Sequence, residues 1–193
     1  MGLRIPLPVA AVLLWTVIVD RSGVCFWTVV AAMLHECGHL LAAWRLHIPL
    51  HQLRLDFLGA RIEVQGRMLS YGEEWLLSAA GPLTSLLSAA AAAVFWRYGA
   101  ARILSCASIV LGLLNLLPIR TFDGGRMLEC LLNRYLGTAV ALPVMRLISF
   151  LFLFLLWACA VYFLLRVGDG LSLFCFSASL LVRFLESERD EFL

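Results

Sequence analysis

An apolar run from Leu147 to Leu165 contains no charged residue. This run is too long for an ordinary strand and matches the roughly 20 residues that a membrane-spanning helix needs. Five further stretches approach the same length and composition. The six stretches are residues 5–20, 24–46, 74–96, 102–118, 139–165 and 170–185. The sequence therefore predicts an all-α polytopic membrane protein with about six transmembrane helices.

The composition supports this prediction. Hydrophobic residues make up 62% of the chain and charged residues only 15%, whereas about a quarter of a soluble domain is charged. The net charge of +2 argues against a nucleic-acid partner. The high hydrophobic content makes the lipid bilayer the expected surroundings. The six cysteines show no CxxC spacing, so disulfides are not indicated. We expect one transmembrane domain over residues 1–193, with its core at about residues 24–137.

The first apolar run, Ile5 to Val19, follows a basic residue and resembles a secretory signal peptide. No small-x-small cleavage site follows it; the next residues are Asp20, Arg21 and Ser22. We therefore interpret this run as a retained and rather short first span.

Two polar interruptions separate the apolar stretches. Residues 53–57 and 62–64 alternate apolar and polar side chains on either side of Gly59, which predicts a β-hairpin between the second and third spans. Because an open sheet edge cannot face lipid, we expect the hairpin at the membrane interface or in a protein-lined cavity. The second interruption spans residues 117–137. There Pro118 should end the preceding helix, and residues 126–135 should form a short amphipathic helix at the membrane surface.

The arginines are distributed unevenly over the loops between these six stretches. Most of them, including Arg45, Arg120 and Arg134, fall on one side of the predicted membrane, and few, such as Arg97, fall on the other. The positive-inside rule assigns the richer side to the cytoplasm. We therefore expect a multi-pass protein of a bacterial cell membrane with both termini, the hairpin and the 117–137 loop on the cytoplasmic side.

The second apolar stretch contains the residues that could bind a metal and catalyse a reaction, in the sequence His35-Glu36-Cys37-Gly38-His39. Two histidines four residues apart on a helix project from nearly the same face, so both imidazoles can reach one zinc ion. Glu36 lies beside this pair and can take a proton from a water molecule that the metal activates. The spacing therefore predicts a Zn²⁺ site with Glu36 as the catalytic base.

The apolar setting strengthens this interpretation. An ionisable group at the centre of a span costs about 2.5–3.5 kcal/mol on insertion scales, so three such groups within five residues need compensation, which a metal supplies. The alternative is an interfacial polar patch or a hydrogen-bonded network between helices.

His47 and His51 share the same four-residue spacing, but Pro49 lies between them and no acidic residue is placed like Glu36. We expect them in the loop that enters the hairpin.

A third zinc ligand must come from elsewhere, because catalytic zinc usually has three protein ligands and one open position. Asp123 is the candidate, since Pro118 ends the helix before it, and Gly124 and Gly125 allow the backbone to approach the histidine helix. The alternative is that Asp123 only caps the helix that starts near Gly125.

Two motifs together resemble the site-2 protease family of intramembrane zinc metalloproteases. The match covers roughly residues 24–137, and the small size resembles the sporulation-type branch. It consists of the HECGH motif, Asn115, Pro118, Asp123, Gly124, Gly125 and the sequence Ala79-Ala80-Gly81-Pro82.

The resemblance implies a zinc site made by His35, His39 and Asp123, with Glu36 as the general base. It also implies that Asn115 and Pro118 shape the substrate side of the cleft. Family members cut membrane-anchored proteins, often transcription or anti-sigma factors, and release a soluble piece. The length leaves no room for the PDZ or CBS domains of larger relatives, so we expect neither.

The predicted function is hydrolysis of peptide bonds in or near the transmembrane segments of a membrane-anchored protein substrate. A transmembrane helix must unwind before it is cut, and the hairpin at residues 53–64 could bind the extended substrate by strand addition; the alternative is a plain connecting loop. Competing functions are a non-proteolytic membrane protein that binds or transports metal and a catalytically silent relative. The substrate and the oligomeric state stay open.

Overall fold

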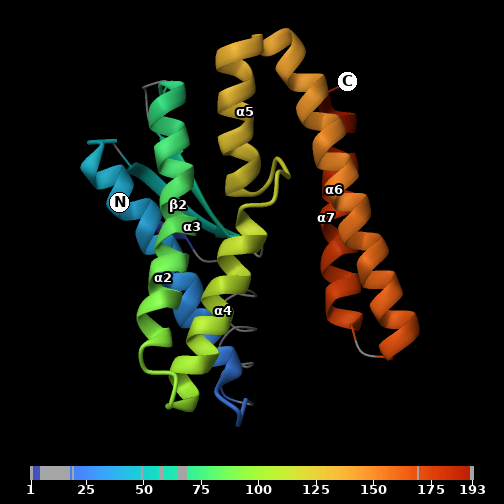
Figure 1. The fold of residues 1–193 in the computed structure, drawn as a ribbon. Helices are drawn as coiled ribbons and strands as arrows, with labels where there is room; N and C mark the ends of the chain where they lie inside the picture. Colours follow the sequence, from blue (N-terminus) through green and yellow to red (C-terminus); the bar gives the residue numbers. More distant parts are fainter. Residues whose placement is uncertain are drawn as a thin grey trace. The chain divides into compact units, whose positions relative to one another are not determined.

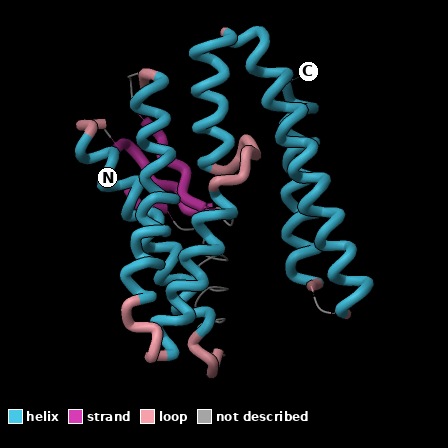
Figure 2. Tube along the Cα trace, viewed as in Figure 1, coloured by secondary structure: helices cyan, strands magenta, loops and turns pink. Residues whose placement is uncertain are grey.

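The computed structural model describes residues 2–4, 18, 20–48, 50–56, 59–64, 69–168 and 170–191. Within this part the chain forms the helices α2 to α7 and three strands (Figures 1 and 2). The predicted first span, residues 5–20, lies almost wholly outside the described residues. The chain divides into two compact units, Met1–Leu116 and Leu117–Leu193.

The first unit contains three helices that pack against one another: α2 (Val24–Arg45), α3 (Tyr71–Ala93) and α4 (Gly99–Asn115). The starts of α2 and α3 each have a reason in the sequence. Asp20 accepts a hydrogen bond from the backbone N–H of Cys25 at 2.6 Å, which satisfies one of the donors left over at the start of α2. Helix α3 starts with a capping box in which Ser70 and Glu73 satisfy each other's backbone N–H groups.

His47, one of the two histidines expected in the loop, ends helix α2. His47 adopts a left-handed conformation with φ of 52°. Its N–H donates to the carbonyl of Trp44, and the N–H of Ile48 donates to the carbonyl of Ala43. These two bonds form a Schellman motif, so His47 terminates the helix. His51, which we expected in the same loop, instead lies within a strand.

Close approach of α2 and α3 depends on a glycine inside the HECGH motif. A Cβ atom on Gly38 would overlap the side chain of Thr84 and would lie 2.5 Å from the carbonyl oxygen of Ala80. Helices can approach to this distance only where one of them carries no side chain. The histidine helix is therefore held directly against the backbone of α3.

The strands form one sheet in the order β1-β2-β3. Strand β2 (Leu50–Asp56) pairs antiparallel with β3 (Gly59–Val64), in the segment where the alternation indicated a hairpin. Strand β1 (Gly2–Arg4) pairs parallel with the other edge of β2. Strand β1 was not predicted, because a three-residue strand leaves almost no alternation to detect.

The second unit consists of α5 (Asp123–Leu136), α6 (Thr138–Val167) and α7 (Leu171–Glu191), with α6 packed against both α5 and α7. Helix α5 extends the predicted amphipathic helix by a few residues at its start. Helix α7 continues through the mostly charged residues 186–191.

Three of the described helices are long and apolar enough to cross a membrane, namely α2, α3 and α6. Helix α4 is apolar but has only 17 residues, because it ends at Asn115, before Pro118. The helical architecture is thus the one expected, whereas the number of six spans stays a prediction.

Candidate metal centre

His35 and His39 lie on one face of α2, as their spacing predicted. Both are buried, with exposed fractions of 4% and 8%. Their Nε2 atoms are 3.3 Å apart, and the two rings meet edge to face with an interplanar angle of 78°. The helix therefore brings two ring nitrogens to the same point.

Helix α3 holds the opposite edges of both rings. The Nδ1 atom of His39 lies 2.8 Å from the carbonyl oxygen of Leu77, and Nδ1 of His35 lies 2.9 Å from Oγ of Ser85. Gly81 lies between these two contacts: a Cβ there would overlap Nε2 of His39 and come within 2.7 Å of Nε2 of His35. Gly81 therefore leaves the space in which the two Nε2 atoms meet.

The separation of the two nitrogens fits one zinc ion. Zinc–nitrogen bonds of about 2.0–2.1 Å at a tetrahedral angle place two ligand nitrogens about 3.3–3.4 Å apart. The two Nε2 atoms lie 3.3 Å apart. A carbonyl oxygen can only accept a hydrogen bond, so Nδ1 of His39 carries the proton and a neutral ring keeps its lone pair on Nε2. The donor geometry thus suits a cation between the rings.

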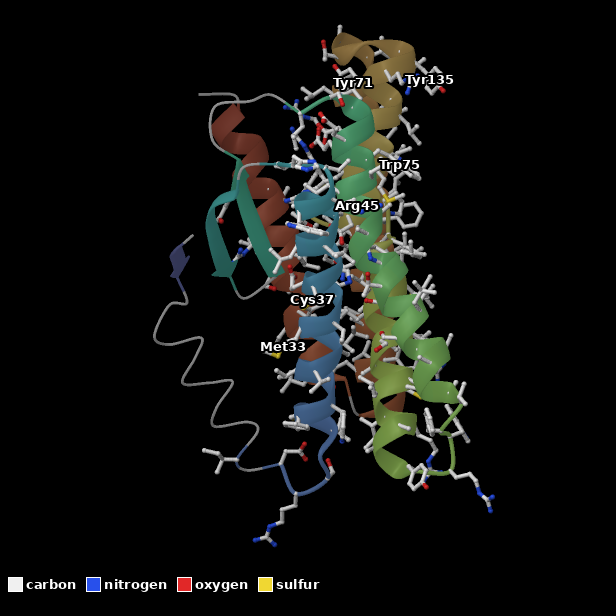
Figure 3. All side chains as sticks on the ribbon, turned by 90° about the vertical axis from the view of Figure 1, so that its left-hand side faces the viewer. Met33, Cys37, Arg45, Tyr71, Trp75 and Tyr135 are labelled. Carbon is white, nitrogen blue, oxygen red and sulfur yellow. The ribbon has the colours of Figure 1, made fainter. Side chains whose placement is uncertain are left out.

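The two residues between the histidines differ in their surroundings. Glu36 is partly buried and follows His35 directly, whereas Cys37 is exposed. Figure 3 shows Cys37 and Met33 on α2, and Met33 lies on the side away from α3, where 64% of its surface is exposed. Cys37 therefore does not share the buried face on which the imidazoles lie.

Asp123 begins α5 in the second unit and has an exposed fraction of 9%. The N-cap of this helix is Phe122, so Asp123 is the first residue of α5, whereas the capping alternative placed the helix start near Gly125. The loop before it folds back tightly, because a Cβ on Gly125 would overlap the carbonyl of Ile119. The backbone N–H of Arg120 donates to Oγ of Ser149 on α6 and anchors the loop within its unit.

The remaining predicted residues occupy the end of α4 and the start of the following loop. Asn115 is the last residue of α4, and its Nδ2 donates to the carbonyl of Leu111 at 3.0 Å. Pro118 follows three positions later, where it prevents α4 from continuing. Their part in substrate binding stays a prediction.

His35, His39 and Asp123 each offer one atom that can bind a metal ion, and their joint role as ligands stays a prediction. Two features of the site were not predicted: the hydroxyl of Ser85 and the carbonyl of Leu77. A serine or a backbone carbonyl in an apolar helix carries no sequence signal of its own. Only their four-residue spacing on either side of Gly81 could have indicated them.

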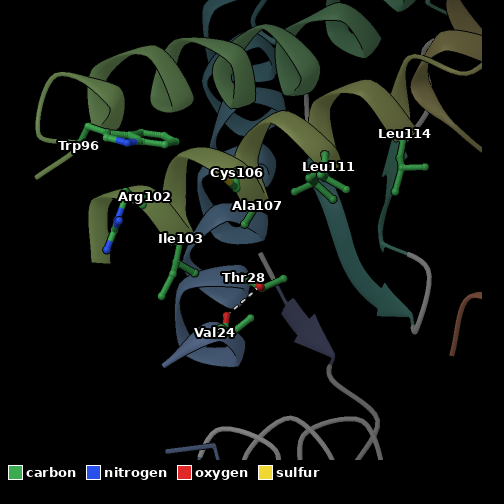
Figure 4. Close-up of a pocket in the computed structure, with 10 residues that line it drawn as sticks. Val24, Thr28, Trp96, Arg102, Ile103, Cys106, Ala107, Leu111 and Leu114 are labelled. Atoms are coloured by element: carbon green, nitrogen blue, oxygen red, sulfur yellow. Dashed lines mark hydrogen bonds between the residues drawn. The ribbon is translucent and has the colours of Figure 1, made fainter. Parts of the chain in front are cut away.

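A separate apolar groove of about 630 Å³ lies beside the start of α2 (Figure 4). Val24 and Thr28 line it on α2, and most of the other residues that line it lie on α4, from Arg102 to Leu114. Val24 precedes His35 by about three turns of helix, or about 16 Å. Neither histidine lines the groove.

Comparison with known proteins agrees with the two motifs. The family model of peptidase family M50 matches residues 100–159, which include Asn115, Pro118 and Asp123. A zinc metalloprotease of Methanocaldococcus jannaschii is 27% identical over 154 residues, which cover 71% of this chain and 45% of that protein. The chain thus spans about half the length of this curated relative.

A solved structure of a site-2 protease from Methanocaldococcus jannaschii has a similar fold. The TM-score is 0.63 at 20% identity, and the match covers 92% of this chain and 84% of the other. At this identity the likeness concerns the fold alone. Taken together, these matches confirm that the chain resembles the site-2 proteases of peptidase family M50, as the two motifs predicted.

Proposed function

We propose that this chain is an intramembrane zinc metalloprotease that hydrolyses peptide bonds in or near the transmembrane segments of membrane-anchored proteins. The observation that carries the proposal is the pair of buried Nε2 atoms 3.3 Å apart on α2. This helix is long and apolar enough to cross a membrane. The resemblance to peptidase family M50 supports the same activity.

His35, His39 and Asp123 would hold the ion through two ring nitrogens and one carboxylate oxygen. This donor set, with two imidazoles and one carboxylate, is one that catalytic zinc uses with an open fourth position. Bound zinc would act as a Lewis acid that makes water nucleophilic near neutral pH.

Glu36 would act as the general base. It takes a proton from the attacking water as the water oxygen bonds to the peptide carbonyl carbon. It then delivers this proton to the nitrogen of the departing amine as the carbon–nitrogen bond breaks. Its place directly after His35 on α2 supports this role, because the glutamate of an HExxH motif lies beside the metal that the histidines bind.

The position of the histidines along α2 bears on how water reaches the site. His39 precedes Arg45, in the last turn of α2, by six residues or about 9 Å of helix. A site this close to a charged helix end is shallow, which favours water entry. Together with the arginine distribution, this supports an active site that opens toward the cytoplasm of a bacterial cell.

The substrate is proposed to bind in an extended form. Strand β2 is paired on both edges, so the open edges among the described strands are the outer edges of β1 and β3. The longer of the two is the outer edge of β3, which has six residues against three in β1. An extended segment could add there through backbone hydrogen bonds. Asn115 and Pro118 would shape the substrate side of the cleft.

A co-expression cleavage assay with candidate single-span substrates tests the proposal. Glu36→Gln removes the base but no proposed ligand, so the variant should bind zinc and fail to cleave. Glu74→Gln, the same change in the first turn of α3, should cleave normally. Normal cleavage by Glu36→Gln would overturn the mechanism. Zinc binding without cleavage by the unmodified chain on any substrate would favour the metal-binding or transport function.

A further inference from the structure

Three residues of α3 face the two imidazoles at intervals of four positions. Leu77 lies against His39, Ser85 lies against His35, and Gly81 lies against both Nε2 atoms. The earlier histidine contacts the later residue of α3 and the later histidine contacts the earlier one, so the two helices run in opposite directions. Two turns of α3, from Leu77 to Ser85, thus enclose the one turn of α2 between the histidines. The face of α3 formed by Leu77, Gly81 and Ser85 is here called the imidazole-facing stripe.

The stripe acts differently on the two rings. The Leu77 carbonyl is an acceptor by its chemistry, so it fixes the proton of His39 on Nδ1. Ser85 carries a hydroxyl that can either donate or accept. When the hydrogen of this hydroxyl points away from the ring, its lone pairs remain for the Nδ1–H of His35.

Neighbouring contacts hold Ser85 in place. It is fully buried, with an exposed fraction of 0%. Its Cβ would lie 3.2 Å from a Cβ on Gly112 of α4, so α4 packs closely behind it. Its carbonyl accepts a hydrogen bond from the hydroxyl of Ser88, which also contacts Ser108 of α4. A side chain held this firmly can orient the ring that it touches.

We propose that Ser85 is a positioning residue of the metal centre. By accepting a hydrogen bond from Nδ1–H of His35, it turns the Nε2 lone pair of His35 toward the ion, as the Leu77 carbonyl does for His39. This inference rests on the proposed zinc site. Partners that orient ligand histidines in this way are worth about 10–100-fold in metal affinity.

The first test measures zinc affinity by competition with a chelator. Ser85→Ala should weaken zinc binding by about 10–100-fold. Ser105→Ala is the matched control, because Ser105 is 1% exposed and donates to the carbonyl of Ala89, away from both histidines. Its affinity should be unchanged. An affinity of Ser85→Ala equal to that of Ser105→Ala would overturn the inference.

The second test reads the ring directly and needs no metal. The chain has four histidines, so ¹⁵N spectra of the metal-free protein at pH 8 can be assigned with single His→Gln variants. His35 should carry its proton on Nδ1 in the unmodified chain and show a mixture of tautomers in Ser85→Ala. An unchanged tautomer would contradict the inference, since a purely structural serine would leave it unchanged.

The two tests separate failure of this inference from failure of the proposed function. If the unmodified chain binds zinc and cleaves, while Ser85→Ala keeps both affinity and tautomer, only the inference fails. If the unmodified chain neither binds zinc nor cleaves, the proposed function fails, whatever the tautomer. If Ser85→Ala does not fold, Ser85→Cys replaces it, because a thiol of similar size is a much weaker acceptor and should shift affinity and tautomer in the same direction.

Discussion

Gly81 of α3 lies directly against His39 of α2, so that a Cβ on the glycine would overlap Nε2 of the imidazole. We expect Gly81→Ala to abolish zinc binding, because the methyl group occupies the space in which both ring nitrogens meet the ion. Metal content of the purified protein, measured by mass spectrometry, checks this outcome.

Gly72→Ala provides the control for this substitution. Gly72 lies in the first turn of the same helix, and a Cβ there would meet nothing within 4 Å. Because alanine favours a helix by up to about 1 kcal/mol over glycine, this variant should keep its zinc and be slightly more stable. Full zinc retention by Gly81→Ala would contradict the proposed position of the ion.

Asp123→Ala tests the third ligand. Loss of a direct ligand should weaken zinc binding by more than the 10–100-fold that is typical of losing an orienting partner. Asp123→Asn should behave similarly, because a neutral amide oxygen is a poorer zinc ligand than a carboxylate. If both variants retain full zinc content, the role of Asp123 is confined to its favourable place in the first turn of α5.

Asp20 predicts a pH dependence at the start of the histidine helix. Hydrogen bonds from the Ser22 hydroxyl and from the backbone N–H of Cys25 hold the pKa of Asp20 below its usual value. A lowered pKa in the folded state stabilises α2 above the unfolded pKa of about 3.9, and this contribution is lost as the pH falls through the folded pKa.

The thermal unfolding of the protein in detergent, followed by circular dichroism from pH 6 to pH 3, measures this effect. Asp20→Ala should unfold at a lower temperature than the unmodified chain at pH 6, and the difference should shrink toward pH 3. Asp20→Asn keeps an acceptor but cannot titrate, so its unfolding should depend less on pH. A constant difference between Asp20→Ala and the unmodified chain would contradict the assignment.

Proline substitutions on β3 test strand addition. Successive backbone N–H groups of a strand point to opposite edges, so of Arg61 and Ile62 one points toward β2 and the other toward the outer edge. Slow amide exchange identifies the one that pairs with β2. Proline at the other position should slow cleavage several-fold and leave zinc content unchanged, because proline removes a donor from the edge. Equal cleavage rates in this variant and the unmodified chain would favour a plain connecting loop.

Much of the helical architecture could be predicted from local patterns. The apolar stretches corresponding to α2, α3 and α6 are long enough to be recognised by composition alone, and Pro118 marks the end of α4. The strand β1 could not be predicted, because it exists only through its pairing with Gln52, Leu53 and Arg54. That pairing joins segments about 50 residues apart, which no local pattern describes.

The candidate site, too, could be predicted only in part from the sequence. The sequence by itself determined that His35 and His39 share one face of a helix, because a helix repeats about every 3.6 residues. Tertiary structure alone decided how their rings are turned. The rings are oriented by Leu77 and Ser85, and the space between them is left by Gly81, all on another helix. Ring orientation depends on which atoms of a distant segment pack against it, and packing of this kind exists only in the folded chain.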